Sequence, residues 1–142
     1  MRNDVAIAFL NTNPPVTEIF LTVNTYDIDI AGHVNNIVYV RWLEDMRNEL
    51  FSQSFSLEKL LKVNHYPVVV SSEIKYKRQI KLFDKPLGKM FMQSYSHGLI
   101  VLKAEIIVDN TLAFVATQKC VFMNLNENKM FTGHIRDLVG QN

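Results

Sequence analysis

The sequence predicts a single α+β domain in which an antiparallel β-sheet curls around one long α-helix. One uninterrupted amphipathic segment between Ile37 and Phe51 supplies the helix. After Pro67 the chain changes to β-branched and aromatic runs that are separated by short turn signals. With one long helix and several strands, a sheet wrapped around the helix buries the apolar side of both.

The helix prediction rests on two opposite stripes in a segment without Gly or Pro. The apolar stripe consists of Tyr39, Trp42, Leu43, Met46 and Leu50, and the polar stripe consists of Arg41, Glu44, Asp45 and Asn48. Further apolar residues at Ile37, Val38 and Val40 indicate a helix enclosed on more than one side near its start. Asn35 or Asn36 suits the N-cap, and a second, shorter helix is expected at Leu57–Val63.

Apolar and polar residues alternate from Ile19 to Thr25, which predicts a first strand. Four more strands are expected in series after Pro67, at Val68–Tyr76, Lys89–Tyr95, Leu99–Val108 and Leu112–Asn124. The turn signals between them leave room only for hairpins, so the sheet is expected to be antiparallel.

The composition limits what the protein can be. The chain has 142 residues, of which 48% are hydrophobic, so residues 1–142 are expected to form one domain, with 1–15 as a loosely held N-terminal arm. A net charge of +1 argues against a nucleic-acid partner. The single cysteine, Cys120, suits a reducing compartment, and neither a signal peptide nor a membrane span is apparent. We therefore expect a cytoplasmic protein.

Polar residues concentrate where the first strand gives way to the helix. Asp27, Asp29, His33, Asn35 and Asn36 lie within ten residues of one another. The amides of a helix N-terminus can stabilise a carbonyl oxygen that gains negative charge, and a nearby carboxylate can activate water or attack the carbon. Capping is the alternative explanation, because Asp and Asn often bond to their own backbone in turns.

This segment carries a family resemblance. Residues 27–36 read Asp-Ile-Asp-Ile-Ala-Gly-His-Val-Asn-Asn, and Tyr39, Trp42, Leu43 and Glu44 follow. The pattern resembles the hot-dog-fold acyl-CoA thioesterases of the 4-hydroxybenzoyl-CoA thioesterase-like family. The His-Val-Asn-Asn tetrad is also similar to bacterial long-chain acyl-CoA thioesterases and plant acyl-carrier-protein thioesterases. The order of elements extends the resemblance from about residue 18 to residue 132.

The resemblance implies roles for individual residues. Asp29 corresponds to the catalytic carboxylate, acting as general base or nucleophile, and Asp27 becomes its structural neighbour. The backbone amide of Asn36 corresponds to the oxyanion donor. His33 and Asn35 match the tetrad, but Ala31 stands where plant-type members have Asn, which leaves His33 as an orienting residue. The residues expected to line the substrate site are Asn35, Tyr39, Leu43 and Glu73.

The resemblance also implies an acyl-CoA substrate, no cofactor, and a homodimer or a dimer of dimers. The exposed edges of a single curled sheet favour such pairing. We expect no inserted membrane segment and no nucleic-acid partner. Scattered cations are candidates for contacting the phosphates of coenzyme A, namely Lys75, Lys77, Arg78, Lys81 and Arg136.

Other kinds of site find little support. The four histidines, His33, His65, His97 and His134, are spread along the chain without metal-ligand spacing, and no nucleophile elbow surrounds a serine. Glu73 is also explained as a cross-strand charge partner. Four alternative functions remain. They are a non-catalytic acyl-thioester-binding protein, a thioesterase acting on acyl carrier protein, a hydratase or dehydratase of the same fold, and an α+β interaction module in which the acidic pair merely caps the helix. The hydratase lacks the helix-borne His and Glu arrangement that it would need.

Overall fold

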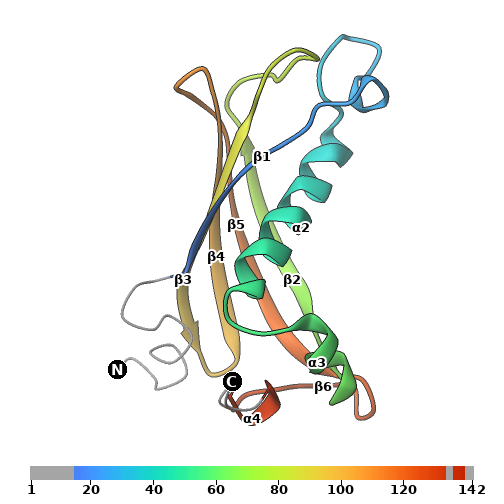
Figure 1. The fold of residues 1–142 in the computed structure, drawn as a ribbon, viewed down its shortest axis with the longest axis vertical. Helices are drawn as coiled ribbons and strands as arrows, with labels where there is room; N and C mark the ends of the chain where they lie inside the picture. Colours follow the sequence, from blue (N-terminus) through green and yellow to red (C-terminus); the bar gives the residue numbers. More distant parts are fainter. Residues whose placement is uncertain (1–14, 134–135, 140–142) are drawn as a thin grey trace.

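A computed structural model describes residues 15–133 and 136–139, and it contains one curled antiparallel sheet with a long helix across one face (Figure 1). The predicted N-terminal arm lies outside the described residues apart from Pro15. The elements are β1 (Val16–Phe20), η1 (Thr25–Asp27), α2 (Asn36–Ser52), α3 (Leu57–Lys62), β2 (His65–Tyr76), β3 (Leu87–Ser96), β4 (Leu99–Val108), β5 (Thr111–Asn124), β6 (Lys129–Met130) and α4 (Arg136–Val139).

The strand order confirms an antiparallel sheet but corrects its expected connectivity. The order is β1-β3-β4-β5-β2, and β6 pairs with β5. β2 therefore pairs with β5, and it does not form a hairpin with β3 as predicted. The connection between β2 and β3 covers residues 77–86, which is longer than a tight hairpin loop and lets the chain cross the end of the sheet.

The first strand begins and ends earlier than predicted. It covers Val16–Phe20, whereas the alternation indicated Ile19–Thr25. Pairing continues for one more bond, from the amide of Leu21 to the carbonyl of Pro86 at 2.9 Å. Pro86 has no N–H to return a bond, so the ladder ends there. The predicted alternation persists beyond the strand, since Leu21 is buried and Thr22 is exposed.

The helix confirms its predicted stripes. All five residues of the apolar stripe are buried, and Leu43, Met46 and Leu50 are fully enclosed against the sheet. All four residues of the polar stripe are exposed. The expected enclosure near the helix start is wrong for this protomer, because Ile37 and Val40 are 57% and 52% exposed. Val38 is buried, and α3 lies where it was predicted.

Close packing between helix and sheet depends on a glycine. A Cβ added at Gly88 on β3 would lie 2.8 Å from the sulfur of Met46 and 3.1 Å from Cδ1 of Leu21. Both neighbours are buried, so neither side chain can swing into solvent. Gly88 therefore allows α2 and the chain after β1 to approach β3 closely.

We expect Gly88→Ala to lower the free energy of unfolding by about 1–3 kcal/mol, because overpacking forces buried side chains from their positions. Equilibrium denaturation in urea measures this change. Ser94→Ala, at an exposed position of the same strand, is the control and should change stability little. Equal stability of wild type and Gly88→Ala would contradict this account of the packing.

Candidate active site

A closed turn precedes the helix and presents Asp29. The amide of Asp29 donates to the carbonyl of His33 at 2.8 Å, and the amide of Gly32 donates to the carbonyl of Asp29 at 3.0 Å. Gly32 has φ +86°, a left-handed conformation that glycine adopts without strain. An isolated bridge between Ile28 and Val34 closes the base of the turn. The turn therefore holds Asp29 in a defined position.

The Asp29 carboxylate is exposed, and hydrogen bonds from described residues reach one of its two oxygens. Its Oδ1 accepts hydrogen bonds from the amides of Ala31 at 3.0 Å and His33 at 3.1 Å. This geometry is the capping role that was the alternative to catalysis. No hydrogen bond to Oδ2 occurs among residues 15–133 and 136–139, so one oxygen remains open to solvent while the other fixes the orientation of the carboxylate.

Asp27 has a different role. Its side chain is buried, and its Oδ2 accepts hydrogen bonds from the backbone amide of Asn24 at 2.8 Å and from Asn24 Nδ2 at 3.2 Å. Its carbonyl accepts from the amide of Asn35 at 2.8 Å. Although their spacing would place Asp27 and Asp29 on one side of an extended strand, η1 turns Asp27 inward. Asp27 thus ties the turn to the helix start.

The helix begins beside this turn. Asn35 is the N-cap, because its side-chain oxygen accepts from the amide of Ile37 at 3.1 Å. Asn36 is the first helical residue, and within the described part of the chain its amide has no hydrogen-bond acceptor. A free amide at the positive end of a helix dipole is suited to stabilising an oxyanion.

The structure separates the remaining predicted site residues. Tyr39 is buried below the helix start, where its ring stacks on Phe114 with centroids 5.0 Å apart and meets Tyr76 edge to face at 5.1 Å. Burial raises the pKa of the Tyr39 hydroxyl, and a hydrogen bond with the backbone of Ile80 opposes this shift. Leu43 has no exposed surface. Both residues support the site from within the core of this protomer.

Glu73 is not brought to the Asp29 turn. It lies on β2 opposite Thr117, on the face of the sheet away from the helix. There it lines a hollow together with Lys75, Phe91 and Lys103. Within one protomer, Glu73 therefore belongs to the outer surface of the sheet.

The connection from β2 to β3 supports the turn from the other side. The amide of Val34 donates to the carbonyl of Ile80 at 2.8 Å, and Ile80 has no exposed surface. Residues 77–86 thus cross the end of the sheet directly beside the Asp29 turn (Figure 1). Local sequence patterns could not indicate this contact, because it depends on β2 crossing to the far edge of the sheet.

Sequence analysis missed a series of hydrogen-bonded polar side chains between α2 and the sheet. Arg47 donates to Oε1 of Gln118 at 2.7 Å, and Nε2 of the buried Gln118 donates to the hydroxyl of Ser72 at 2.9 Å. Burial lowers the pKa of Arg47. The spacing of Arg47 could have indicated this role, because a residue four positions after Leu43 and three before Leu50 lies beside the apolar stripe of the helix.

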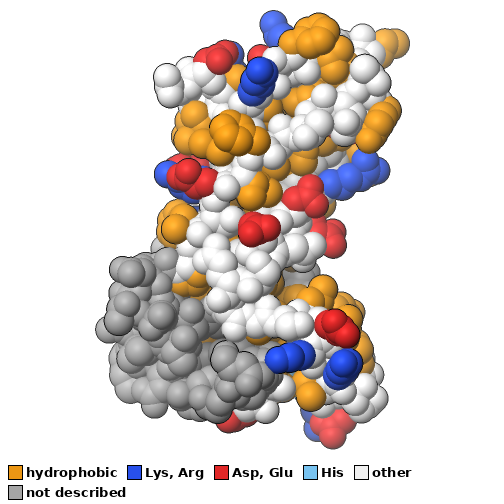
Figure 2. Space-filling view, viewed as in Figure 1, with side chains coloured by type: hydrophobic (Ala, Val, Ile, Leu, Met, Phe, Trp, Pro, Cys, Tyr) orange, Lys and Arg blue, Asp and Glu red, His pale blue; other side chains and the backbone are white. Residues whose placement is uncertain are grey.

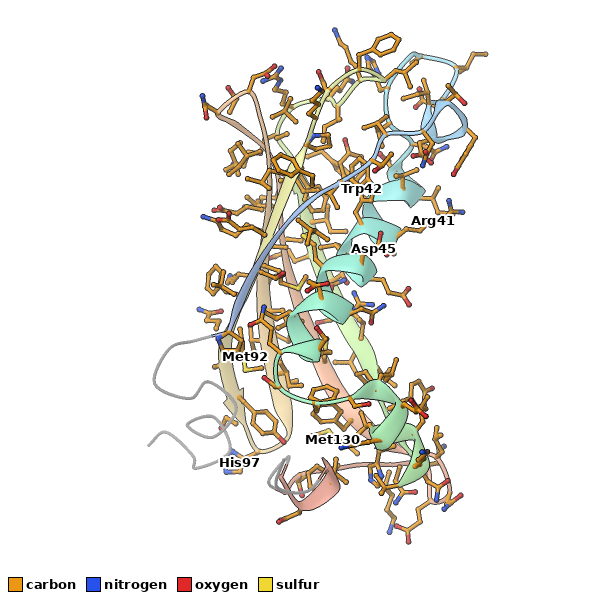
Figure 3. The ribbon with its side chains drawn as sticks, in the orientation of Figure 1. Arg41, Trp42, Asp45, Met92, His97 and Met130 are labelled. Atoms are coloured by element: carbon orange, nitrogen blue, oxygen red, sulfur yellow. The ribbon has the colours of Figure 1, made fainter. Side chains whose placement is uncertain are left out.

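Asp29 lines none of three hollows found among the described residues. One of about 570 Å³ lies at the other end of α2, where Phe51, Phe55 and Pro67 line it. Another of about 380 Å³ lies between α2 and the chain after β1, and Asp27 and Trp42 line it. In Figure 3 Trp42 lies on the sheet side of α2, and the exposed Arg41 and Asp45 lie on its outer side. Hydrogen bonding and exposure, rather than a deep cavity, therefore identify the candidate site.

Two further properties concern the described residues alone. They contain no group of three or more His, Cys, Asp or Glu side chains that could hold a metal ion, and His134 lies outside them. None of the helices in this part of the chain is both long and apolar enough to cross a bilayer.

Comparison with known proteins identifies the family. Residues 23–132 match the thioesterase-like superfamily. The chain belongs to this superfamily. Comparison with curated proteins found no match. The match to the thioesterase-like superfamily confirms the resemblance that the motif predicted, and with it the class of thioester hydrolase.

Solved structures share the fold of this thioesterase-like chain. The DHNA-CoA thioesterase of Staphylococcus aureus superposes with a TM-score of 0.75 and 23% identity over 84% of this chain and 80% of that one. The probable thioesterase YbaW of Escherichia coli gives 0.73 and 25% over 86% and 93%. A thioesterase of Thermus thermophilus, complexed with coenzyme A and zinc, gives 0.72 and 22% over 91% and 100%. The predicted hot-dog fold is confirmed.

We expect Asn35→Ala to lower the free energy of unfolding by about 1 kcal/mol, because the amide of Ile37 loses its capping acceptor. Asn35→Asp is the matched control, since a carboxylate keeps an acceptor at the helix N-terminus. Urea denaturation of both variants measures the difference. Equal losses in the two variants would show that capping is not the contribution of Asn35.

Proposed function

We propose that this protein hydrolyses acyl-CoA thioesters to a free carboxylic acid and coenzyme A. Family membership supports thioester hydrolysis, and the site supports a mechanism that needs no cofactor. The observation that carries the proposal is an exposed carboxylate, fixed through one oxygen with the other open, in a turn that leads directly into a helix with a free first amide.

In the proposed reaction Asp29 acts as a general base. Its open oxygen takes a proton from water as the water oxygen adds to the thioester carbon. As the carbonyl oxygen gains negative charge, it accepts a hydrogen bond from the amide of Asn36. The carbon–sulfur bond then breaks, and the departing thiolate takes up the proton. Direct attack by Asp29 would instead pass through a mixed anhydride that water hydrolyses to the same products.

His33 and Asn35 act as positioning residues in this proposal. The amide and carbonyl of His33 both bond to Asp29, so His33 holds the carboxylate through its backbone. Asn35 fixes the first turn of the helix and thereby the direction of the Asn36 amide. Tyr39 and Leu43 support the helix start from the core.

We also propose that the active unit is a homodimer joined through β2. β2 is a long edge strand with β5 as its partner in the described sheet. Apolar side chains along it are exposed, including Val70 at 56% and Tyr76 at 48%, and Ile37 and Val40 of the neighbouring helix are exposed as well. A second copy would cover these residues, and the helix start would then be enclosed as its apolar residues predict.

We expect Asp29→Asn to reduce kcat by at least about a hundredfold, because the amide can accept the turn hydrogen bonds but cannot accept the proton. Release of free thiol from short, long and aromatic acyl-CoAs measures the rate, and circular dichroism checks the fold. Asp109→Asn removes an exposed carboxylate in the β4–β5 turn and should leave the rate unchanged.

Two results would contradict the catalytic role. Equal rates for wild type and folded Asp29→Asn would assign Asp29 to turn formation alone. If the wild type binds acyl-CoA but cleaves neither acyl-CoA nor acyl carrier protein, the non-catalytic binding function would replace hydrolysis. Cleavage of carrier-bound substrates alone would change the substrate and keep the reaction.

The dimer proposal predicts that Val70→Asp lowers the mass in solution to that of one chain, because two carboxylates would be buried at the shared edge. Light scattering after size-exclusion chromatography measures the mass. Val16→Asp on β1, the other edge strand, changes a valine of similar exposure (49%) and should leave the dimer intact. If Val16→Asp dissociated the dimer and Val70→Asp did not, the interface would be assigned to β1 instead of β2.

A further inference from the structure

Positive charge is concentrated beside the Asp29 turn. Residues 77–85, here called the cationic segment, contain Lys77, Arg78, Lys81 and Lys85 but only one carboxylate, Asp84. The rest of the chain carries eleven Lys and Arg against thirteen Asp and Glu. All four cations are exposed, and none forms an ion pair with another described residue. The segment is therefore a local field of positive charge on a nearly neutral protein.

Hydrogen bonds hold the backbone of the cationic segment in place. The amides of Lys77 and Arg78 donate to the carbonyl of Ala113 at 2.8 and 3.0 Å, and Nη1 of Arg78 donates to the carbonyl of Val108 at 3.3 Å. At the other end, the amide of Lys81 donates to Oδ2 of Asp84 at 2.9 Å. The one carboxylate thus closes a turn of its own segment.

This turn presents an aromatic ring between two cations. Phe83 is 89% exposed, and Lys81 and Lys85 lie two residues to either side of it. Exposing a phenyl ring to water is unfavourable for a free protein, so a planar partner would gain by covering it. Figure 2 shows basic and hydrophobic side chains side by side at the end of the molecule that holds the connection from β2 to β3.

The cationic segment lies within reach of the chemistry. Ile80, at its centre, accepts the hydrogen bond from Val34 of the Asp29 turn. Lys85 is five residues beyond Ile80, which limits its backbone to about 17 Å from that contact. The turn between β3 and β4 contains His97 as its one basic residue, and His97 lies at the opposite end of the molecule (Figure 3).

We propose that the cationic segment binds the nucleotide end of coenzyme A, with its cations on the three phosphate groups and Phe83 stacked on the adenine. This proposal rests on the proposed function, because it assigns the residues that bind the nucleotide end of the same substrate. Charged hydrogen bonds to phosphate are among the strongest in proteins, and base–aromatic stacking adds to them. The compact group of phosphates matches a short segment better than the broad acidic surface of a carrier protein.

Thioesters with one acyl group and three different thiols test the proposal. They are the thioesters of coenzyme A, 3′-dephospho-coenzyme A and pantetheine, and the enzyme is the chain of residues 1–142. For the wild type we expect kcat/KM to fall in that order. For Lys81→Gln/Lys85→Gln and for Phe83→Ala we expect the KM for acyl-CoA to rise about tenfold, while acyl-pantetheine is cleaved at the wild-type rate.

The control variant is Lys119→Gln/Lys129→Gln, which removes two exposed cations outside the cationic segment and should alter neither substrate. Equal kcat/KM for acyl-CoA and acyl-pantetheine in the wild type would overturn the proposal. Equal losses on both substrates in the variants would overturn it too, because they would indicate a disturbed Asp29 turn. If the wild type cleaves acyl thioesters of the carrier protein faster than acyl-CoA and the variants lose this preference, the cationic segment would instead bind an acidic protein partner.

Calorimetric titration with coenzyme A separates this proposal from the proposed function. If no thioester is cleaved but the variants bind coenzyme A about tenfold more weakly than the wild type, hydrolysis fails and the nucleotide site stands. Binding of equal strength in wild type and variants, or no binding by the wild type, would overturn the nucleotide site whatever the hydrolysis assay shows.

Discussion

The structure depends on burying one stripe of α2 against the inner face of the curled sheet. Leu43, Met46 and Leu50 have no exposed surface, and complete burial of such a side chain is worth about 1.5–3 kcal/mol. The sheet has to approach the helix closely for this, and Gly88 makes the approach sterically feasible. Because the core fixes the helix axis, it also fixes where the helix N-terminus meets the rest of the chain.

The candidate site results from this placement and from three short backbone contacts. Asp27 ties the turn to Asn35, the bridge between Ile28 and Val34 closes the turn, and Ile80 holds it from the side. The carboxylate of Asp29 and the amide of Asn36 thus belong to groups whose positions the core determines. Preorganised groups of this kind need little rearrangement when charge develops during a reaction.

Local patterns predicted most of the elements, because the stripes of α2 and the alternation of the strands are properties of neighbouring residues. The placement of β2 against β5 could not be predicted in this way, since it depends on residues far apart in the sequence. The same limit explains Glu73, whose face of the sheet follows from that pairing. The family resemblance already assigned Asp29 and Asp27 different roles, and the structure adds that the carboxylate of Asp29 is exposed whereas that of Asp27 is buried.

The crossing of β2 to the far edge of the sheet has a consequence for synthesis of the chain. His65 pairs with Asn124 and Tyr76 pairs with Phe114, so β2 has no partner until the last long strand has been made. On the ribosome, α2 and β2 emerge well before β5, and their apolar surfaces stay uncovered during that interval. Such surfaces are the ones that chaperones bind and that drive aggregation. Synthesis of β5, the last long strand, therefore ends the period in which the nascent protein is most vulnerable.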